Sequence, residues 1–433
     1  MSKVDEPTGP EIPSEELSEV AARKAELAVP AELVAGSATE YLRAAIARIK
    51  AGEAGILPVV GGLIVVSILF QSLNSHFLTA QNLVNLLIQA AVFALLGMGE
   101  VFVLLLGEID LSVGYVAGMG AVTMADAAGP AHGWPWWAAI GLALLVCAGI
   151  GLIQGLIITQ IGLPSFVVTL AGLLFLEGVM LKILGNGGTI AINDTVINDI
   201  ASNNLSNAAS WVVMLVIVGV FSLLAWRRDS KRRRAGLVAP PATITLLKIG
   251  VVLASGVGLV LLCTVNRGII EPISGVPWVV LLVLAVLGAW SFLLGRTPVG
   301  RYIYAIGGSA EAARRAGINV SAIRTLAFTL TGLTAGIAGI VYASRLRSIS
   351  TSIDGGTLVL YAVAAAVIGG TSLMGGRGKA LHGVLGGIVI AAIYNGMGLM
   401  GYGAPAQYMV TALVLLAAVT IDATSNRGRV AGT

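Results

Sequence analysis

The chain contains few of the residues on which metal sites and disulfide-rich domains depend. Its 433 residues include only two cysteines and three histidines, and charged residues make up 11% of the chain. Cys147 and Cys263 both lie inside apolar runs, which argues against a disulfide or metal framework and favours a packing role. His76, His132 and His382 are far apart in the sequence. We therefore expect no metal site and no cofactor.

The motifs of nucleotide hydrolysis and nucleophilic catalysis are also missing. Segment 374–380 approaches the phosphate-loop pattern, but Leu373 stands where a glycine is required and Ala380 lacks the hydroxyl that would hold Mg²⁺. There is no Gly-x-Ser-x-Gly elbow, no His-Glu-x-x-His and no basic-aromatic surface typical of nucleic-acid binding. The basic run 227–234 borders an apolar segment, so membrane orientation and anionic lipid explain it. We expect neither an enzyme nor a nucleic-acid-binding protein.

Apolar residues are what the chain has in abundance, at 57% of all positions. About twenty of them span a bilayer as a helix. The predicted fold class is therefore all-α, a polytopic membrane helical bundle of about twelve transmembrane helices (10–12). The predicted spans are 56–73, 83–106, 111–128, 136–157, 164–184, 210–226, 246–265, 277–294, 325–342, 358–374, 381–400 and 405–421. The short joints at 107–110 and 158–163 leave open a broken or re-entrant helix.

The placement of Lys and Arg tests the orientation of these spans. With a cytosolic N-terminus, 22 of the 26 basic residues fall on the inner side. Only four fall on or near the outer side, namely Lys182, Arg267, Arg345 and Arg347. Because cytoplasmic loops carry the excess of Lys and Arg, this asymmetry supports the predicted topology.

The ends of the chain differ from its apolar centre. Residues 1–38 are rich in acids and prolines and predict a disordered cytosolic tail. Residues 39–52 have apolar positions at helical spacing among basic ones, which predicts an amphipathic helix on the membrane surface, with an ordinary linker helix as the alternative. The transmembrane domain is predicted over 53–424, with an inner loop at 295–324, and 425–433 forms a second cytosolic tail.

Glycine is frequent, at 56 residues, and is paired at 369–370, 375–376 and 386–387. Small residues let helix backbones approach closely in lipid, where van der Waals contact drives association. Close helix packing is the expected role of most of these glycines.

Several polar side chains interrupt the apolar segments. Asn85, Gln89 and Glu100 lie within about 60° on a helical wheel, so they should face protein or water. The segment 107–114, Gly-Glu-Ile-Asp-Leu-Ser-Val-Gly, sets two acids between two spans, where a charge is costly unless it is paired or hydrated. Candidates for a substrate pathway are Asn85, Gln89, Glu100, Glu108, Asp110, Ser112 and Glu177. Gln154 is a further buried polar residue, and a structural hydrogen-bonding role is an equal alternative.

The inner loop 295–324 contains a short run of good helix formers, Glu311 to Ala316, followed by Gly317 as a helix-ending glycine. We expect a short helix on the cytosolic face. It offers either a rigid surface for a soluble partner or an ordinary surface helix without one.

Three segments resemble permease subunits of ribose- and xylose-type ABC importers. Segment 107–114 looks like their signature after an early span. Segment 300–308, followed by Glu311-Ala312-Ala313 and Gly317-Ile318-Asn319, resembles their cytosolic coupling segment. Segment 364–376 resembles their late glycine-rich motif. The extra spans within 210–265 and the long N-terminal tail resemble the xylose-type members more than the ribose-type ones.

The resemblance implies a transport subunit of the bacterial plasma (inner) membrane that imports a small neutral sugar, xylose or a related pentose or hexose. Implied partners are an ABC ATPase subunit, an extracytoplasmic sugar-binding protein, a second permease copy in a homodimer, and membrane lipid. The implied ATPase contacts are on the coupling helix, at Glu311, Ala312, Ala313, Arg314 and Gly317.

Two other transporter classes remain open. A twelve-helix secondary transporter would also have a basic loop after its sixth span, and Glu100, Glu177 or Asp110 could serve its coupling ion. A branched-chain amino acid ABC permease is the nearest alternative within the importer class. A membrane-embedded enzyme is disfavoured because no nucleophile–base or metal constellation is visible.

Overall fold

The computed structural model describes residues 56–237, 239–268, 272–351, 355–414, 416 and 420. The chain divides into two compact units, one of 1–54 with 211–258 and the other of 55–210 with 259–433. The two predicted tails, 1–38 and 425–433, and the predicted surface helix 39–52 lie outside the described residues.

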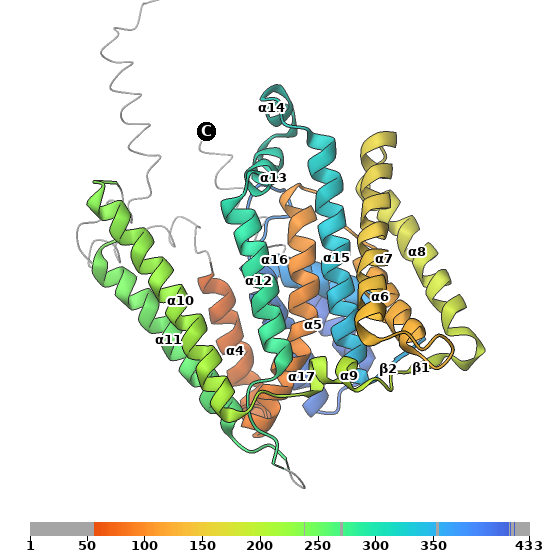
Figure 1. Ribbon diagram of the computed structural model, residues 1–433, viewed down its shortest axis with the longest axis horizontal. Coiled ribbons are helices and arrows are strands. Elements are labelled where there is room, and N and C mark those ends of the chain that lie inside the picture. The colour runs from red at the N-terminus through yellow and green to blue at the C-terminus, as the bar shows by residue number, and fades with distance from the viewer. Residues whose placement is uncertain are drawn as a thin grey trace, which may run out of the picture. The chain divides into compact units, whose positions relative to one another are not determined.

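Helices make up nearly all of the larger unit (Figure 1). In chain order its elements are α4 (Leu57–Leu73), α5 (Ala80–Leu105), α6 (Val113–Ala128), α7 (Trp136–Leu156), η1 (Ile157–Ile161), α8 (Ser165–Leu184), η2 (Gly185–Gly187), β1 (Thr189–Ala191), α9 (Thr195–Ser202), α12 (Trp278–Arg296), α13 (Pro298–Gly308), α14 (Ala310–Arg315), α15 (Val320–Leu346), β2 (Ser348–Ser350), α16 (Gly355–Ile368) and α17 (Ala380–Leu399). The smaller unit holds most of α10 (Asn207–Arg234) and α11 (Ala242–Thr264).

Every predicted span overlaps a helix over the described residues, although α16 ends at Ile368, before the predicted end of the span 358–374. Eight helices are long and apolar enough to cross a membrane: α5, α7 with η1, α8, α10, α11, α12, α15 and α17. Helices α4 and α16 are apolar but shorter. The predicted all-α membrane bundle is confirmed.

The predicted span 111–128 is instead a 16-residue helix, α6, that lies inside the bundle. It packs against α7, α8, α15 and α16, and most of its side chains are buried. It is shorter than predicted because residues 107–112 form the turn that separates it from α5. The joint at 158–163 is mostly a π-helical extension of α7, η1, which ends at Gly162 with a φ of +80°.

Four small elements, β1, β2, α9 and α13, have no counterpart in the sequence prediction. Strands β1 and β2 pair antiparallel, with Thr189 opposite Ser350 and Ala191 opposite Ser348. Helix α9 follows β1, and helix α13 precedes the short helix α14. Strands of three residues are too short for an alternating pattern to stand out in a sequence.

Helix α5 is the most buried of the eight helices long and apolar enough to cross a membrane. It packs against α12, α15, α16 and α17. On α17, Gly383 faces the backbone of Gly97 and Met98, and Gly387 faces the backbone of Phe93 and Ala94. A Cβ atom at either glycine would overlap those backbone atoms. The close packing predicted from the paired glycines is present here, since small residues set the approach of the two helices.

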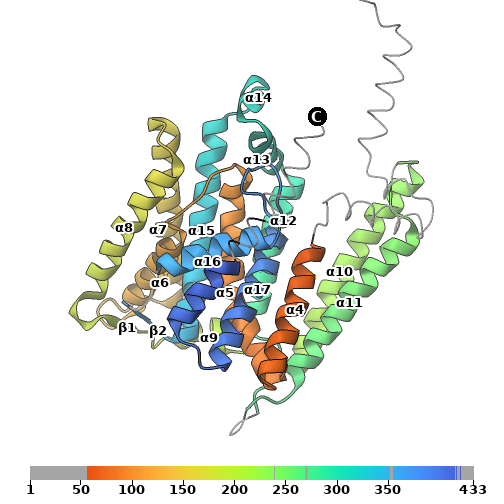
Figure 2. The same ribbon diagram turned by 180° about the vertical axis from the view of Figure 1, so that it is seen from behind.

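The two ends of the larger unit differ in what they carry. Helices α13 and α14 lie at one end, and β1, β2 and α9 lie at the opposite end (Figures 1 and 2). The end with α13 and α14 is the inner end of the topology predicted from charge. The joints 107–112 and 157–164 lie at this same end.

The smaller unit consists of an apolar helical pair with a basic terminus. Asp229 is buried, accepts a hydrogen bond from the Thr245 hydroxyl at 3.0 Å and pairs with Arg228 at 2.9 Å. The guanidinium of Arg233 lies 5.6 Å from the centre of the Trp226 ring. Ionic and aromatic contacts of this kind suit a helix end at a membrane surface.

Candidate functional site

The turn after α5 is shaped by a glycine. Gly107 adopts a φ of +75°, which L side chains rarely adopt. Its N–H donates to the Leu104 carbonyl at 2.9 Å, and the N–H of Glu108 donates to Val103 at 3.0 Å. These two bonds end α5 in a Schellman motif and turn the chain toward α6. Glu108 and Asp110 therefore leave the helix in different directions.

Asp110 enters a buried polar cluster formed with Glu100, Ser112 and Gln154. The Ser112 hydroxyl and N–H both donate to Oδ1 of Asp110, at 2.6 and 2.8 Å. The amide of Gln154 donates to the Ser112 hydroxyl at 2.9 Å. The N–H of Asp110 donates to Oε1 of Glu100 at 3.2 Å. The cluster links α5, the 107–112 turn and α7.

The electrostatics of this cluster are those of enclosed acids. Glu100 and Asp110 are 0% and 1% exposed. Burial raises the pKa of the Asp110 carboxyl above its ordinary value, and the two hydrogen bonds from Ser112 oppose that shift. Glu100 Oε2 and Gln89 Oε1 are buried without a hydrogen-bond partner among the described residues. Unpaired buried acceptors are costly, so Glu100 Oε2 is the atom at which the cluster is incomplete, and Gln89 Oε1 is a second unpaired acceptor elsewhere on α5.

The three sequence segments that carry the family resemblance meet at the end of α5. Gly107 lies against Met374 and Gly375. Gly307 lies against the Leu105 carbonyl and Gly376, whose N–H donates to that carbonyl at 2.8 Å. The glycines allow this approach because a Cβ on Gly307 would overlap the backbone of its neighbours. Segments 107–114, 300–308 and 364–376 therefore form one contiguous structure.

The predicted short helix is present as α14, and both of its ends are capped. The Ser309 hydroxyl accepts from the N–H of Ala312 at 3.2 Å. At the other end Gly317, with a φ of +84°, and Ile318 donate to Arg314 and Ala313 in a Schellman motif. These caps fix a six-residue helix that could not persist by itself.

The surface of α14 is charged and internally paired. Glu311 accepts from Arg314 at 2.7 Å and from Arg315 at 3.1 Å, and all three side chains are more than half exposed. Ala312 is exposed as well, whereas Ala313 is buried against the bundle. Such exposed pairs contribute little to stability.

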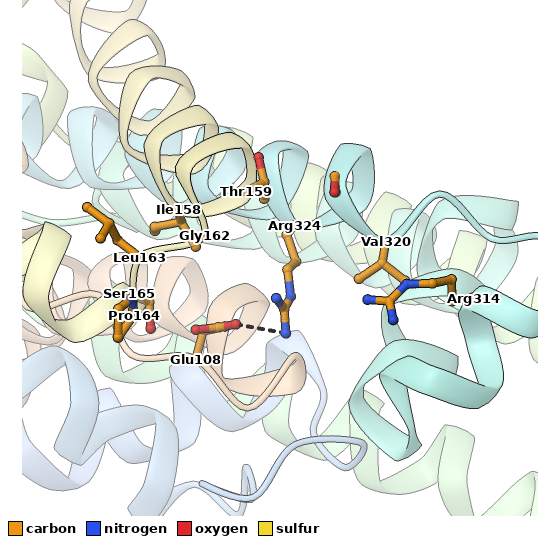
Figure 3. Close-up of a pocket in the computed structure, with 11 residues that line it drawn as sticks. Glu108, Ile158, Thr159, Gly162, Leu163, Pro164, Ser165, Arg314, Val320 and Arg324 are labelled. Atoms are coloured by element: carbon orange, nitrogen blue, oxygen red, sulfur yellow. Dashed lines mark ion pairs between the residues drawn. The ribbon is translucent and has the colours of Figure 1, made fainter.

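A cavity of about 320 Å³ lies between α14, the start of α15 and the α7–α8 turn (Figure 3). Its lining residues are Glu108, Ile158, Thr159, Gly162, Leu163, Pro164, Ser165, Arg314, Val320, Ser321 and Arg324. Arg324 reaches across it to Glu108, with Nη2 at 3.1 Å from Oε1. This ion pair joins the turn after α5 to the first turns of α15. Glu108, which lies between two predicted spans in the sequence, therefore has an ion-pair partner.

The structure brings together some of the predicted pathway residues and separates others. Glu100, Asp110 and Ser112 are in contact, and Glu108 lies in the neighbouring cavity. Gln89 is buried on α5. Asn85, one turn earlier, is exposed.

Glu177 lies half-buried on α8 and takes no part in the buried cluster. Within the described ranges, His, Cys, Asp and Glu side chains form no group of three that could hold a metal ion. Sequence reasoning missed Arg324 and Ser165. Only their place at the start of predicted spans could have drawn attention to them.

Comparison with known proteins gives consistent matches. The family described as branched-chain amino acid transport system / permease component matches residues 82–419. Xylose transport system permease protein XylH of Escherichia coli (strain K12) is 35% identical over 82% of this chain and 88% of its own length. XylH of Haemophilus influenzae is 35% identical over 82% and 92%. Ribose import permease protein RbsC of Escherichia coli (strain K12) is 30% identical over 83% and 91%. No solved structure matches.

Proposed function

The chain belongs to the branched-chain amino acid transport system / permease component family, and on that premise we propose that it is the membrane permease subunit of an ATP-driven importer of a small neutral sugar. Xylose or a related pentose or hexose is the proposed cargo. The observation that carries this proposal is the 35% identity to the xylose permease XylH over 82% of the chain.

The chain is a multi-pass protein of the plasma membrane and a transport subunit, not a catalytic enzyme. In the proposed importer, ATP is hydrolysed by a separate ABC ATPase subunit on the inner side, and an extracytoplasmic sugar-binding protein delivers the sugar on the outer side. A second copy of the chain would complete the membrane part as a homodimer.

Helix α14 is the proposed contact with the ATPase, through Glu311, Ala312, Ala313, Arg314 and Gly317. Its position supports this role, since it lies exposed at the end predicted to be cytosolic. Its caps hold it rigidly, and a rigid element transmits a push that a flexible loop would absorb. The chain passes directly from α14 through Gly317 into α15.

The route from α14 to the membrane interior follows contacts already described. Helix α15 carries Arg324, which pairs with Glu108 in the turn after α5. That turn also carries Asp110 and Ser112 of the buried cluster. Movement of α14 would therefore displace the turn between α5 and α6. Rigid-body motion between two packed states is the usual form of such a switch.

The proposed pathway residues remain Asn85, Gln89, Glu100, Glu108, Asp110, Ser112 and Glu177. Burial of Glu100, Asp110 and Ser112 within one chain favours a role in holding α5, α6 and α7 together. Gln89, with its unpaired Oε1, is the member of this set best suited to meet a sugar hydroxyl in another conformation.

Reconstitution tests the proposal against its alternatives. Proteoliposomes with this chain, its ATPase and its binding protein should accumulate radiolabelled xylose only when ATP is supplied on the ATPase side. Accumulation that needs a proton gradient and survives without ATP would support an ion-coupled transporter instead. Uptake of leucine in preference to xylose, ribose and glucose would favour the amino acid permease that the family description names.

A further inference from the structure

The cavity beside α14 has a lining that the transport of a neutral sugar does not explain. We propose that it binds a small phosphate-bearing anion. The cytosolic origin of the anion rests on the proposed function. Its binding is inferred from the residues that line the cavity.

The charge of the cavity favours an anion. Two guanidinium groups line it, those of Arg314 and Arg324, against the single carboxylate of Glu108. Arg324 donates to Glu108 through Nη2, and Arg314 donates to Glu311 through Nη1. A guanidinium has five N–H donors, so each arginine keeps donors for a further acceptor. Planar, forked donors of this kind suit phosphate oxygens.

The wall opposite the arginines adds neutral donors. Ser165 is 7% exposed, lines the cavity, and its hydroxyl has no hydrogen-bond partner among the described residues. It is the first residue of α8, a 20-residue helix whose N-cap, Pro164, supplies no side-chain acceptor. The first N–H groups of a helix lack partners within the helix, and the helix dipole favours negative charge there. Ser321 brings a second hydroxyl from the start of α15.

The dimensions of the cavity restrict the ligand. About 320 Å³ is at the small end of ligand pockets and admits inorganic phosphate or a phosphate ester of a few carbons. The same chemistry is offered by a soluble phosphate ester and by the headgroup of an anionic phospholipid. In either case the ligand would tie α14 and α15 to the start of α8. An occupied cavity would then restrain the helix proposed to contact the ATPase.

The test uses the full chain, purified in an uncharged detergent without its partners. Titration calorimetry with glycerol 3-phosphate should show saturable binding, and titration with glycerol should show none. Arg324→Gln should weaken binding at least about tenfold, because it removes a charge-assisted donor. Ser165→Ala should weaken it about threefold. Arg301→Gln, at an exposed position on α13 outside the cavity, is the charge-matched control and should bind as the wild type does.

A second arm separates the two sources of phosphate. In nanodiscs, phosphatidylglycerol should leave the glycerol 3-phosphate titration unchanged if the natural ligand is soluble, and should abolish it if the lipid headgroup fills the cavity. The proposal is overturned if neither probe binds, or if Arg324→Gln and Arg301→Gln behave alike.

Gel filtration and the thermal midpoint report whether each variant is folded. If Arg324→Gln misfolds, the titration is repeated with the double variant Ser165→Ala/Ser321→Ala. Binding by this variant equal to that of the wild type overturns the proposal. No ATPase or sugar enters these measurements, so a negative result leaves the proposed transport function untouched.

Discussion

Helix α5 and the pair α10–α11 are about equally apolar but lie in opposite surroundings. In the most apolar stretch of α5, 89% of the residues are buried within the protein, against 17% for α10 and 11% for α11. Hydropathy alone therefore identifies a membrane helix without saying whether it faces protein or lipid. An all-apolar helix suits either surrounding.

The residues of α5 and α10 account for the difference in their burial. Helix α5 carries three buried polar residues, Asn82, Gln89 and Glu100, which need protein partners. Its glycines meet other helices: Gly97 lies against Ala365 and Gly383. On α10, Gly219 has open space where a side chain would be. A glycine against the backbone of another helix distinguishes α5, whereas Gly256 of α11 meets only side chains of α10.

A leucine in place of a glycine should have opposite effects at a glycine that contacts α5 and at a glycine of α10 with open space beside it. Gly387→Leu should unfold the larger unit or prevent insertion, because the backbone of α5 occupies the space that the side chain needs. The expected loss exceeds about 3 kcal/mol. Gly219→Leu on α10 should leave folding unchanged. Fluorescence-detected gel filtration of both variants checks this, and equal yields would refute the account of the glycine contacts.

The buried cluster is the next feature to test. Asp110→Ala removes the acceptor of both Ser112 bonds and should cost about 2 kcal/mol, with impaired transport. Asp126→Ala, at a half-exposed acid on the far end of α6, should have little effect. Thermal midpoints in detergent and uptake by cells provide the measurement. Full stability and uptake in Asp110→Ala would make this acid dispensable.

The ion pair in the cavity should have a smaller effect. Glu108→Arg or Arg324→Glu alone places like charges together. The double exchange restores the pair, which contributes about 1 kcal/mol, because its partners are partly buried, at 31% exposed for Arg324 and 14% for Glu108. A double-mutant cycle on the thermal midpoint and on uptake measures this coupling. Additive effects would show that the contact does not join α15 to the turn.

The exposed helix α14 should respond least in stability and most in coupling. Glu311→Lys breaks two exposed ion pairs, and Gly317→Asp forces a φ of +84° on a non-glycine residue, at about 1 kcal/mol. We expect both variants to insert and yet to lose the ATPase on co-purification. Lys379→Glu, a reversal of charge elsewhere at the same end, should retain it. Retention in all three would argue against the coupling role.

The fold was largely predictable because each membrane helix is specified by residues that are neighbours in the sequence. Each span needs only its own run of apolar residues, so each predicted span overlaps a helix over the described residues. The enclosed position of α6 was not predicted, because it depends on neighbours distant in the sequence. Helix α14 was found because a good helix former and a closing glycine are local signals as well.

The site was less predictable because its contacts are not local. Glu108 and Arg324 are separated by more than two hundred positions, and no periodicity relates them. The helical wheel grouped Asn85 with Gln89 correctly by angle. It could not show that Asn85 is exposed while Gln89, one turn later, is buried. Three glycine-containing segments had to be placed in space before their meeting point was visible.

Helix α15 runs without interruption from the loop after α14 to β2, which pairs with β1. Its 27 residues make a rod about 40 Å long. Glycines 332, 336 and 339 along its middle lie against α6 and α7, which makes that stretch the natural fulcrum. A tilt of about 10° there would carry the two tips about 3 Å in opposite directions. The tip that follows α14 and the tip that precedes β2 would then move together as the two ends of one rigid helix.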